Sequence, residues 1–329
     1  MKKVLITGIT GFVGSHLAEF YLGRHPNSPK QKSEIFGLVR RRSQRDLIRH
    51  LEPELHLEEG DVADAHSMEQ LVAEIQPDVV HHLAAQSFVP LSWTAPSETF
   101  QTNLMGSLNL LEAVRRHQPK AVVQVASSSE IYGTQDHFPV TEQSLPNPLS
   151  PYAVSKLAMD RLAYQYAKSY NLSIVITRGF NHTGPRRGPS FVTSNFARQV
   201  VEIEQGIREK VIWVGNLDAE RDWTDVRDMV FAYALAVEKC PPGQVFNISS
   251  GISRRVGDLL TQLLGLAGVK AEIREDPKRQ RPSDVPRLEG DSGPFRRQTG
   301  WEPRIPWEQT LGDLLDYWRL TLEGKTWKP

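Results

Sequence analysis

Four side chains near the middle of the chain have types and spacing suited to acid–base chemistry. Ser128 and Glu130 follow an apolar run in VASSSEIYG, and Tyr152 and Lys156 stand four residues apart in SPYAVSK. Residues i and i+4 share one face of a helix, so the lysine would lie close to the tyrosine. A nearby ammonium, together with a second positive charge in the site, lowers the pKa of a phenol, which can then take a proton from an alcohol. The spacing therefore predicts proton transfer at a substrate hydroxyl, whose oxygen Ser128 would hold by a hydrogen bond.

The elements around these residues alternate between short apolar runs and helix-like stretches. Runs rich in β-branched residues lie near residues 4, 35, 55, 79, 122 and 173. Nearly continuous apolar strands that alternate with helices indicate a parallel sheet covered on both faces. The expected fold class is α/β, a Rossmann-type doubly wound parallel sheet with helices on both faces and a smaller α/β substrate-binding domain. Ser128 would then lie at the carboxyl edge of the sheet, where reactive groups gather in such folds.

The pattern loosens after about residue 180. Proline and glycine cluster there in TGPRRGPS and EDPKRQRPSDVP. We therefore expect a Rossmann domain over residues 1–177 that binds the cofactor and carries the catalytic residues. Residues 178–329 would form mainly a substrate domain, with some segments returning to the first domain.

Composition argues against several classes of partner. Lysine plus arginine and aspartate plus glutamate number 39 each, so the formal net charge is zero and gives no support to nucleic-acid or membrane-surface binding. The single cysteine, Cys240, excludes an intrachain disulfide and a cysteine-based zinc site. Glycines break the apolar run at the N-terminus, and no long apolar segment follows. We expect a soluble cytoplasmic protein with neither a nucleic-acid nor a membrane partner.

The histidines do not indicate a metal site. His81 and His82 are adjacent in an expected strand and so would point to opposite faces of the sheet. No His-Glu-x-x-His or comparable spacing occurs. We expect no catalytic metal.

Three glycines between the first apolar run and the first helix indicate a dinucleotide cofactor. Gly8, Gly11 and Gly14 stand in TGITGFVGSHLA. Glycines permit the tight turn and let backbone N–H groups at the helix start approach a pyrophosphate. Arg40 and Arg41, at the end of the second run, complement a 2′-phosphate, so NADP is favoured over NAD, which remains possible.

Other expected cofactor contacts follow neighbouring strands. Asp61 comes after the third run and could contact adenine, and LAAQS, residues 83–87, follows the fourth. The expected contacts are Gly8, Gly11, Phe12, Val13, Gly14, Arg40, Arg41, Asp61, Val62, Leu83, Ala84, Ala85, Ser87, Tyr152 and Lys156.

These motifs resemble those of the extended, nucleotide-sugar-modifying branch of the short-chain dehydrogenase/reductase superfamily. The matching stretches are GITGFVG, HLAAQS, Ser128 and YAVSK. Within that branch, GDVADAHS, HLAAQSFVPLSW and RGFNHTGPRRGPSFVT are similar to GDP-mannose 4,6-dehydratases. The resemblance implies a GDP-sugar substrate, a cofactor role for His182 and Arg187, and a homodimer or homotetramer. The residues it implies near the sugar nucleotide are Ser87, Ser128, Asn181, Val192 and Thr193.

The resemblance also implies roles for the four residues named first. The dehydratases use a Thr, Glu, Tyr and Lys pattern, which falls here on Ser128, Glu130, Tyr152 and Lys156. Once carbon 4 of the sugar is a ketone, the proton on carbon 5 becomes acidic, and a carboxylate can remove it and help expel the carbon 6 hydroxyl as water. The implied reaction converts GDP-mannose to GDP-4-keto-6-deoxy-D-mannose.

Departures from the dehydratase pattern keep other activities open. Ser128 stands in place of a threonine, and the glycine turn reads GFVG where the dehydratases usually have Gln-Asp in its middle. The stretches VGNLDAERDWTDVRDMV and RQRPSDVPRLEGD are as similar to GDP-4-keto-6-deoxy-mannose reductases, which form GDP-D-rhamnose. A nucleotide-sugar 4-epimerase would use the same Ser, Tyr and Lys, and an inactive NADP-binding regulator is the alternative from another class. For the enzymes, Arg221 and Arg281 are expected to bind the substrate diphosphate.

Overall fold

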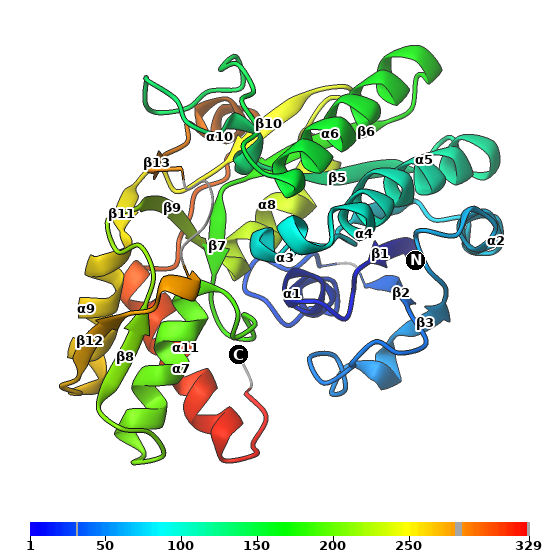
Figure 1. Cartoon of the computed structure of the whole chain (residues 1–329). Helices are drawn as coiled ribbons and strands as arrows, with labels where there is room; N and C mark the ends of the chain where they lie inside the picture. The colour runs from blue at the N-terminus through cyan, green and yellow to red at the C-terminus, as the bar shows by residue number, and fades with distance from the viewer. Residues whose placement is uncertain (31, 280–284, 328–329) are drawn as a thin grey trace.

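A parallel β-sheet forms the centre of the molecule in the computed structural model, which describes residues 1–30, 32–279 and 285–327. Its strands are β1 (Lys2–Thr7), β2 (Ser33–Val39), β3 (His56–Glu59), β4 (Val79–His82), β5 (Val122–Ser128), β6 (Ile174–Gly179) and β10 (Val245–Ile248). Within the described residues these seven strands lie in the order β10-β6-β5-β4-β1-β2-β3, and every neighbouring pair is parallel (Figure 1). The order steps outward from β1 in both directions, which confirms the predicted doubly wound Rossmann-type sheet.

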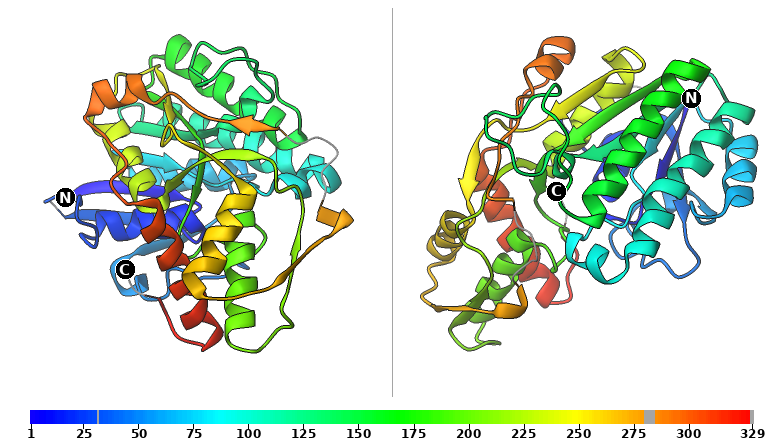
Figure 2. Two further views of the ribbon diagram at one scale, coloured as in Figure 1. Left: turned by 90° about the vertical axis from the view of Figure 1, so that its left-hand side faces the viewer. Right: turned by 45° about the horizontal axis from the view of Figure 1, so that its top comes forward.

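Helices cover both faces of this sheet (Figure 2). On one face lie α1 (Phe12–Tyr21) and α8 (Val226–Lys239), and on the other lie α2 (Ala65–Ile75), α5 (Gly106–His117) and α6 (Pro151–Tyr170). Successive strand residues point to opposite faces, so Val4 and Ile6 of β1 pack with α1 and α8, while Leu5 packs with α2, α5 and α6. The nearly continuous apolar strands of the sequence thus contribute side chains to the cores on both faces of the sheet.

A smaller α/β unit stands beside the carboxyl edge of the sheet (Figure 1). Its own core combines α7 (Val192–Glu204), α9 (Val256–Ala267) and α11 (Trp307–Leu322) with β8 (Val211–Val214) and β9 (Glu220–Asp225). Strand β9 pairs with three short strands, β7 (Asn181–Thr183), β11 (Ser253–Arg255) and β13 (Arg287–Leu288). Strand β8 pairs with β12 (Glu272–Glu275). In sequence, α8 and β10 stand between parts of this unit, yet they belong to the layers of the large sheet.

The remaining helices are short. They are α3 (Val89–Thr94), α4 (Pro96–Phe100), the π-helix η2 (Gln101–Met105), α10 (Gly293–Thr299) and the 3₁₀-helices η1 (Glu52–Glu54), η3 (Ser129–Tyr132) and η4 (Pro277–Arg279). In the part of the chain that the structure describes, no helix is both long enough and apolar enough to cross a membrane.

Candidate active site

A cavity of about 1630 Å³ runs along the carboxyl edge of the sheet and continues into the smaller unit. It is lined by all but one of the predicted site residues that the structure describes. The exception is Arg41, whose exposed side chain does not reach the cavity. Arg281 lies outside the described residues. Residues from both halves of the sequence therefore meet in one site.

The glycine turn between β1 and α1 is a cradle made of backbone. Gly8 has φ +75°, and a Cβ there would lie 2.9 Å from the Ala84 nitrogen. A Cβ on Gly14 would lie 2.2 Å from the Gly8 carbonyl oxygen. No side chain caps the start of α1, so the N–H groups of its first turn are available to an anion. These features fit a pyrophosphate, which needs donors and space at the same place.

Arg40 and Asp61 stand at the same end of the cavity, after β2 and β3. The Arg40 N–H donates to Ser43 Oγ at 3.2 Å, and the Ser43 N–H donates to the Arg40 carbonyl at 2.8 Å. Both Arg40 and the next residue, Arg41, are exposed, but only Arg40 lines the cavity. A guanidinium beside the cradle suits a phosphate on the cofactor's ribose.

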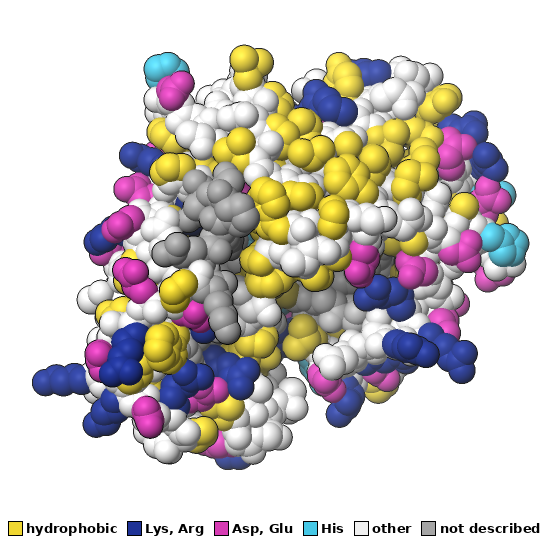
Figure 3. Space-filling model, viewed as in Figure 1, with side chains coloured by type: hydrophobic (Ala, Val, Ile, Leu, Met, Phe, Trp, Pro, Cys, Tyr) yellow, Lys and Arg dark blue, Asp and Glu magenta, His cyan; other side chains and the backbone are white. Residues whose placement is uncertain are grey.

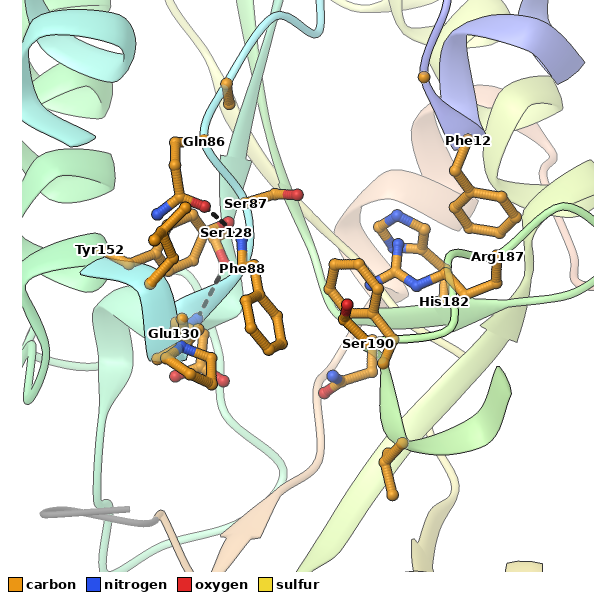
Figure 4. Close-up of a pocket in the computed structure, with 18 of the residues that line it drawn as sticks. Phe12, Gln86, Ser87, Phe88, Ser128, Glu130, Tyr152, His182, Arg187 and Ser190 are labelled. Carbon is orange, nitrogen blue, oxygen red and sulfur yellow. Dashed lines mark hydrogen bonds between the residues drawn. The ribbon is translucent and has the colours of Figure 1, made fainter. Parts of the chain in front are cut away.

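Ser128, Glu130 and Tyr152 share one wall of the cavity (Figure 4). Ser128 ends β5, and its Oγ accepts the Glu130 N–H at 3.2 Å, which starts the turn η3. Tyr152 lies in the first turn of α6, where Ser150 Oγ accepts the Ala153 N–H at 3.1 Å and a proline occupies the first helical position. The predicted convergence of hydroxyl, carboxylate and phenol is therefore present.

Burial is the largest influence on the protonation of this wall. Burial raises the pKa of Tyr152 to about 12; its hydrogen bond with Ser128 and the charge of Arg187 act against this, and the charge of Glu130 adds to it. Burial also lowers the pKa of Lys156 to about 8. The Lys156 ammonium donates to the Ala126 carbonyl at 2.8 Å. The protein's own groups thus raise the pKa of the phenol, and the lowering that we expect from Lys156 together with the positive charge of a bound nicotinamide stays a prediction.

The facing wall is built from an aromatic and cationic stack (Figure 4). The rings of Phe12 and His182 lie parallel with centroids 6.0 Å apart, and the Arg187 guanidinium lies 4.9 Å from the Phe12 ring and 3.4 Å from the Phe191 ring. Burial, aided by the charge of Arg187, lowers the pKa of His182 to about 4, so this imidazole is neutral near pH 7. A cation held over ring faces keeps a fixed place without a carboxylate partner.

The end of the cavity inside the smaller unit holds the residues expected at the sugar nucleotide. Asn181 lies on β7, Val192 and Thr193 begin α7, and Arg221 lies on β9. Two buried polar atoms of the cavity lining, Asn181 Oδ1 and Ser127 Oγ, have no hydrogen-bond partner in the residues that the structure describes. Buried polar groups are rarely left unpaired, so both atoms indicate a ligand position. Ser127 was not among the predicted residues.

Asn103 is a second residue that the sequence did not single out. Its Oδ1 accepts the Gln86 N–H at 2.8 Å, and its Nδ2 donates to the Gln86 carbonyl at 3.1 Å and to Ser155 Oγ at 2.9 Å. It therefore fixes the predicted LAAQS loop against α6, the helix of Tyr152. In the sequence Asn103 is an ordinary polar residue. Only the structure shows that its side chain is fully buried.

The two adjacent histidines of β4 point to opposite faces, as predicted. His81 pairs with Tyr21 at 2.8 Å and Gln124 at 3.0 Å, whereas His82 pairs with Thr7 and Ser107, both at 2.8 Å. Burial lowers the pKa of His81 to about 4 and that of His82 to about 3, so both rings are neutral parts of the core. Among the described residues, no cluster of three or more His, Cys, Asp or Glu could hold a metal ion.

Known proteins resemble this chain over nearly its whole length. The family model described as GDP-mannose 4,6 dehydratase matches residues 5–314. The GDP-6-deoxy-D-mannose reductase of Pseudomonas aeruginosa is 34% identical over 319 residues, which cover 96% of this chain and 97% of that protein. A GDP-mannose 4,6-dehydratase of Yersinia enterocolitica is 33% identical over 348 residues, which cover 96% of this chain and 93% of that protein.

Solved structures also resemble this chain over nearly its whole length. The structure of RMD from Pseudomonas aeruginosa complexed with NADPH superposes with a TM-score of 0.82 at 31% identity, covering 97% of this chain and 99% of that one. A UDP-glucose 4-epimerase from Thermotoga maritima with UDP-glucose superposes with a TM-score of 0.87 at 28% identity and the same coverage. From its sequence and fold together, the chain is a member of the GDP-mannose 4,6-dehydratase family of extended short-chain dehydrogenases/reductases.

Proposed function

We propose that the protein is an NADP-dependent enzyme acting at carbon 4 of a GDP-hexose, and that it dehydrates GDP-mannose to GDP-4-keto-6-deoxy-D-mannose. The observation that carries this proposal is the shared wall of Ser128, Glu130 and Tyr152, which offers a hydrogen-bonding hydroxyl, a carboxylate and a phenol to one sugar. Family membership supports the substrate class.

Each group has a separate task in this proposal. The glycine turn would hold the pyrophosphate of a nicotinamide dinucleotide, which would supply reversible hydride transfer with the sugar. Tyr152 takes the proton of the 4-hydroxyl while Ser128 holds the same oxygen by a hydrogen bond. Glu130 removes the carbon 5 proton of the ketone and gives a proton to the departing carbon 6 hydroxyl, which leaves as water. Water is then the only net loss from the sugar.

The pKa of Tyr152, about 12, requires added positive charge before the phenol can act as a base near pH 7. The positively charged ring of a bound oxidised nicotinamide would supply this charge beside Lys156, whose pKa of about 8 keeps it mostly protonated at pH 7. Burial strengthens the effect of each charge, since the surrounding dielectric is low. Lys156 would also hold the cofactor's ribose.

NADP rather than NAD is proposed because Arg40 lines the cradle end of the cavity and no acidic residue stands at the end of β2. The RMD structure of Pseudomonas aeruginosa contains NADPH, which supports this preference. The other proposed cofactor contacts are those of the glycine turn, the loop after β4, His182 and Arg187.

Reduction of the ketosugar is the second candidate function. The alignment with the reductase of Pseudomonas aeruginosa spans 319 residues, whereas that with the Yersinia enterocolitica dehydratase spans 348, more than the 329 residues of this chain. The dehydratase therefore carries inserted segments that this chain lacks. The same Ser, Tyr and Lys would serve both reactions, as they would in a 4-epimerase.

Product analysis separates these activities. Purified protein is given GDP-mannose with catalytic NADP, and the sugar product is identified by mass and by its carbonyl. The dehydratase forms a ketosugar with no net change in reduced cofactor; an epimer of unchanged mass indicates a 4-epimerase. The reductase leaves GDP-mannose unchanged and consumes NADPH stoichiometrically when given the ketosugar. Absence of all three reactions despite NADPH binding would indicate a regulator.

Two variants test the assigned roles in the same assay. Tyr152→Phe should lower turnover by about 10²- to 10⁴-fold, as loss of a general base does. Glu130→Gln should retain hydride removal from carbon 4 but lose elimination of water. Undiminished dehydration by Glu130→Gln would remove that carboxylate from the mechanism.

We propose a homodimer as the basic assembly. Apolar side chains gather on the surface over α3, α4 and α6, visible as yellow atoms in the upper half of Figure 3. The exposed large apolar side chains of α3, α6 and the neighbouring η2 include Leu91, Trp93, Met105, Val154 and Tyr164, each more than a third exposed. Sedimentation velocity of the wild type and of Val154→Glu tests this: the variant should shift to monomer, and a monomeric wild type would refute the assembly.

A cytoplasmic location is proposed on composition. One cysteine in 329 residues fits a reducing compartment. Fractionation of the source cells with an antibody to the protein would test it.

A further inference from the structure

A network of buried polar groups lies directly beneath the turn that carries Glu130. Tyr132, the last residue of η3, is completely buried. Its hydroxyl donates to Asn247 Oδ1 at 2.7 Å and accepts from Arg178 Nη1 at 2.8 Å. The Arg178 guanidinium also lies 5.2 Å from the centre of the Tyr132 ring. The end of the catalytic turn is thus attached to strands β6 and β10.

Arg178 extends this attachment to helix α6. Its Nε and Nη2 donate to the two carboxylate oxygens of Asp160 at 2.9 and 3.0 Å. Tyr152, Lys156 and Asp160 are spaced four residues apart and lie along one side of α6. A continuous path of hydrogen bonds therefore joins the helix of the proposed base Tyr152 to the turn of the proposed base Glu130.

The two charged groups of this path, the Arg178 guanidinium and the Asp160 carboxylate, form a buried ion pair. Burial alone would raise the pKa of Asp160, but the hydrogen bonds and charge of Arg178 outweigh it, and the pKa is lowered. Both side chains are almost fully buried, so the pair cannot exchange its partners for water. Such a bidentate pair has one geometry, and it fixes the direction in which Arg178 presents Nη1 to Tyr132.

Glu130 itself has no comparable support. Among the residues that the structure describes, its carboxylate takes part in no hydrogen bond or ion pair, although its backbone N–H donates to Ser128 Oγ. Its place in the cavity therefore depends on the backbone of η3. That backbone is held at one end by Ser128 and at the other by the buried side chain of Tyr132.

We propose that Tyr132, Arg178 and Asp160 are positioning residues that set the distance between the Glu130 carboxylate and the Tyr152 phenol. The inference rests on the proposed function in one respect, that these two groups act on adjacent carbons of one sugar. Two bases fixed on separate elements reach neighbouring carbons only if the elements keep their spacing. A misplacement of about 1 Å can lower a rate about 100-fold.

Tyr132→Phe tests the proposal, because it removes the hydroxyl and keeps the ring. The matched control is Tyr21→Phe, which removes another buried hydroxyl, bonded to His81 at 2.8 Å in the core between the sheet and α1. Hydrogen exchange measured by mass spectrometry should become faster at the amides of residues 129–133 in Tyr132→Phe and stay unchanged there in Tyr21→Phe. Unchanged exchange at the turn in Tyr132→Phe would overturn the proposal whatever reaction the enzyme catalyses.

Kinetics give a second readout that general loss of stability would not reproduce. Tyr132→Phe should lower kcat about 10- to 100-fold and leave KM within about twofold, since the residue does not contact substrate. In a Glu130→Gln background the same change should not lower the residual turnover further, because the group it positions is already gone. Equal effects in both backgrounds would show that Tyr132 does not act through Glu130.

Arg178→Lys keeps the experiment decisive if Tyr132→Phe folds poorly. A lysine can retain the charge pairing with Asp160 but cannot donate to Asp160 and Tyr132 together, so exchange at residues 129–133 should again rise. If the wild type leaves GDP-mannose unconverted, the proposed function fails, while the exchange data still decide on the network.

Discussion

Glu19 and Arg186 form a buried ion pair between helix α1 and the loop that follows β7. Arg186 Nη1 donates to Glu19 Oε2 at 3.0 Å and Nη2 donates to Oε1 at 2.6 Å. Burial alone would raise the pKa of Glu19, but the Arg186 guanidinium outweighs it, and the pKa is lowered. Because α1 begins at the glycine turn and Arg187 follows Arg186 into the cavity, this pair joins two walls of the site.

Glu19→Gln should therefore destabilise the protein strongly. It leaves the Arg186 charge buried without a counter-charge, and such losses cost about 3–5 kcal/mol of unfolding free energy. The control is Glu204→Gln, whose partner Arg319 is half-buried and which should cost less than about 1 kcal/mol. Urea unfolding followed by circular dichroism measures both, and equal midpoints for the two variants would contradict the importance of the buried pair.

The parts of the site that sequence predicts well are those held within one short segment. Gly8, Gly11 and Gly14 occupy a single turn, and Tyr152 and Lys156 lie on one helix, so spacing alone decides their relation. Parallel-strand order then brings Ser128 beside them, because the carboxyl ends of neighbouring strands share an edge.

Contacts between distant segments could not be predicted in this way. Glu19 and Arg186 are separated by 167 positions, and Tyr132 and Asn247 by 115. Their side chains are ordinary charged and polar residues in the sequence, and only packing reveals that they are buried partners. The pKa of Tyr152 also depends on burial, so the spacing between Tyr152 and Lys156 does not by itself give the direction in which this pKa shifts.

Gly14→Ala should abolish tight cofactor binding. A Cβ at this position would lie 2.2 Å from the Gly8 carbonyl oxygen, so the turn must open and its N–H groups must move. Overpacking of this kind costs about 1–3 kcal/mol of stability as well. Gly312→Ala is the control, because a Cβ there, inside α11, meets nothing within 4 Å and should stabilise the helix by about 0.5–1 kcal/mol.

Fluorescence titration with NADPH and thermal unfolding measure the two glycine variants. We expect Gly14→Ala to unfold at a lower temperature than the wild type and to bind no NADPH. We expect Gly312→Ala to unfold at a slightly higher temperature and to bind NADPH normally. Normal NADPH affinity in Gly14→Ala would show that the cofactor does not use this turn.

Arg40→Ala should discriminate between the two cofactors. A hydrogen bond to a charged group contributes about 1.5–3 kcal/mol, so loss of the guanidinium should weaken NADPH binding about 10- to 100-fold and leave NADH binding nearly unchanged. Arg41→Ala is the matched control, since its neighbouring side chain does not line the cavity. Titrations at constant ionic strength measure the affinities of both variants for NADPH and for NADH. A larger loss of NADPH affinity in Arg41→Ala than in Arg40→Ala would assign the 2′-phosphate contact to Arg41 instead.

The affinity for NADPH should also fall as the pH rises through about 8. Burial lowers the pKa of Lys156 to about 8, so the ammonium is present below this pH and is lost above it. A bound dinucleotide, with its phosphates and ribose hydroxyls, favours the charged amine, so binding above pH 8 must take up a proton. The dissociation constant should therefore rise by up to about tenfold per pH unit above pH 8. The second ionisation of a phosphate lies near pH 6, well below this range.

Lys156→Met identifies the titrating group in this experiment. It should bind NADPH more weakly than the wild type below pH 8, with an affinity that no longer changes between pH 7.5 and 9.5. Arg40→Ala serves as the control, because it weakens binding at a different place and should keep the wild-type pH dependence. If the wild-type affinity stays constant across pH 8, or if Lys156→Met shows the same slope as the wild type, the ammonium of Lys156 does not hold the cofactor.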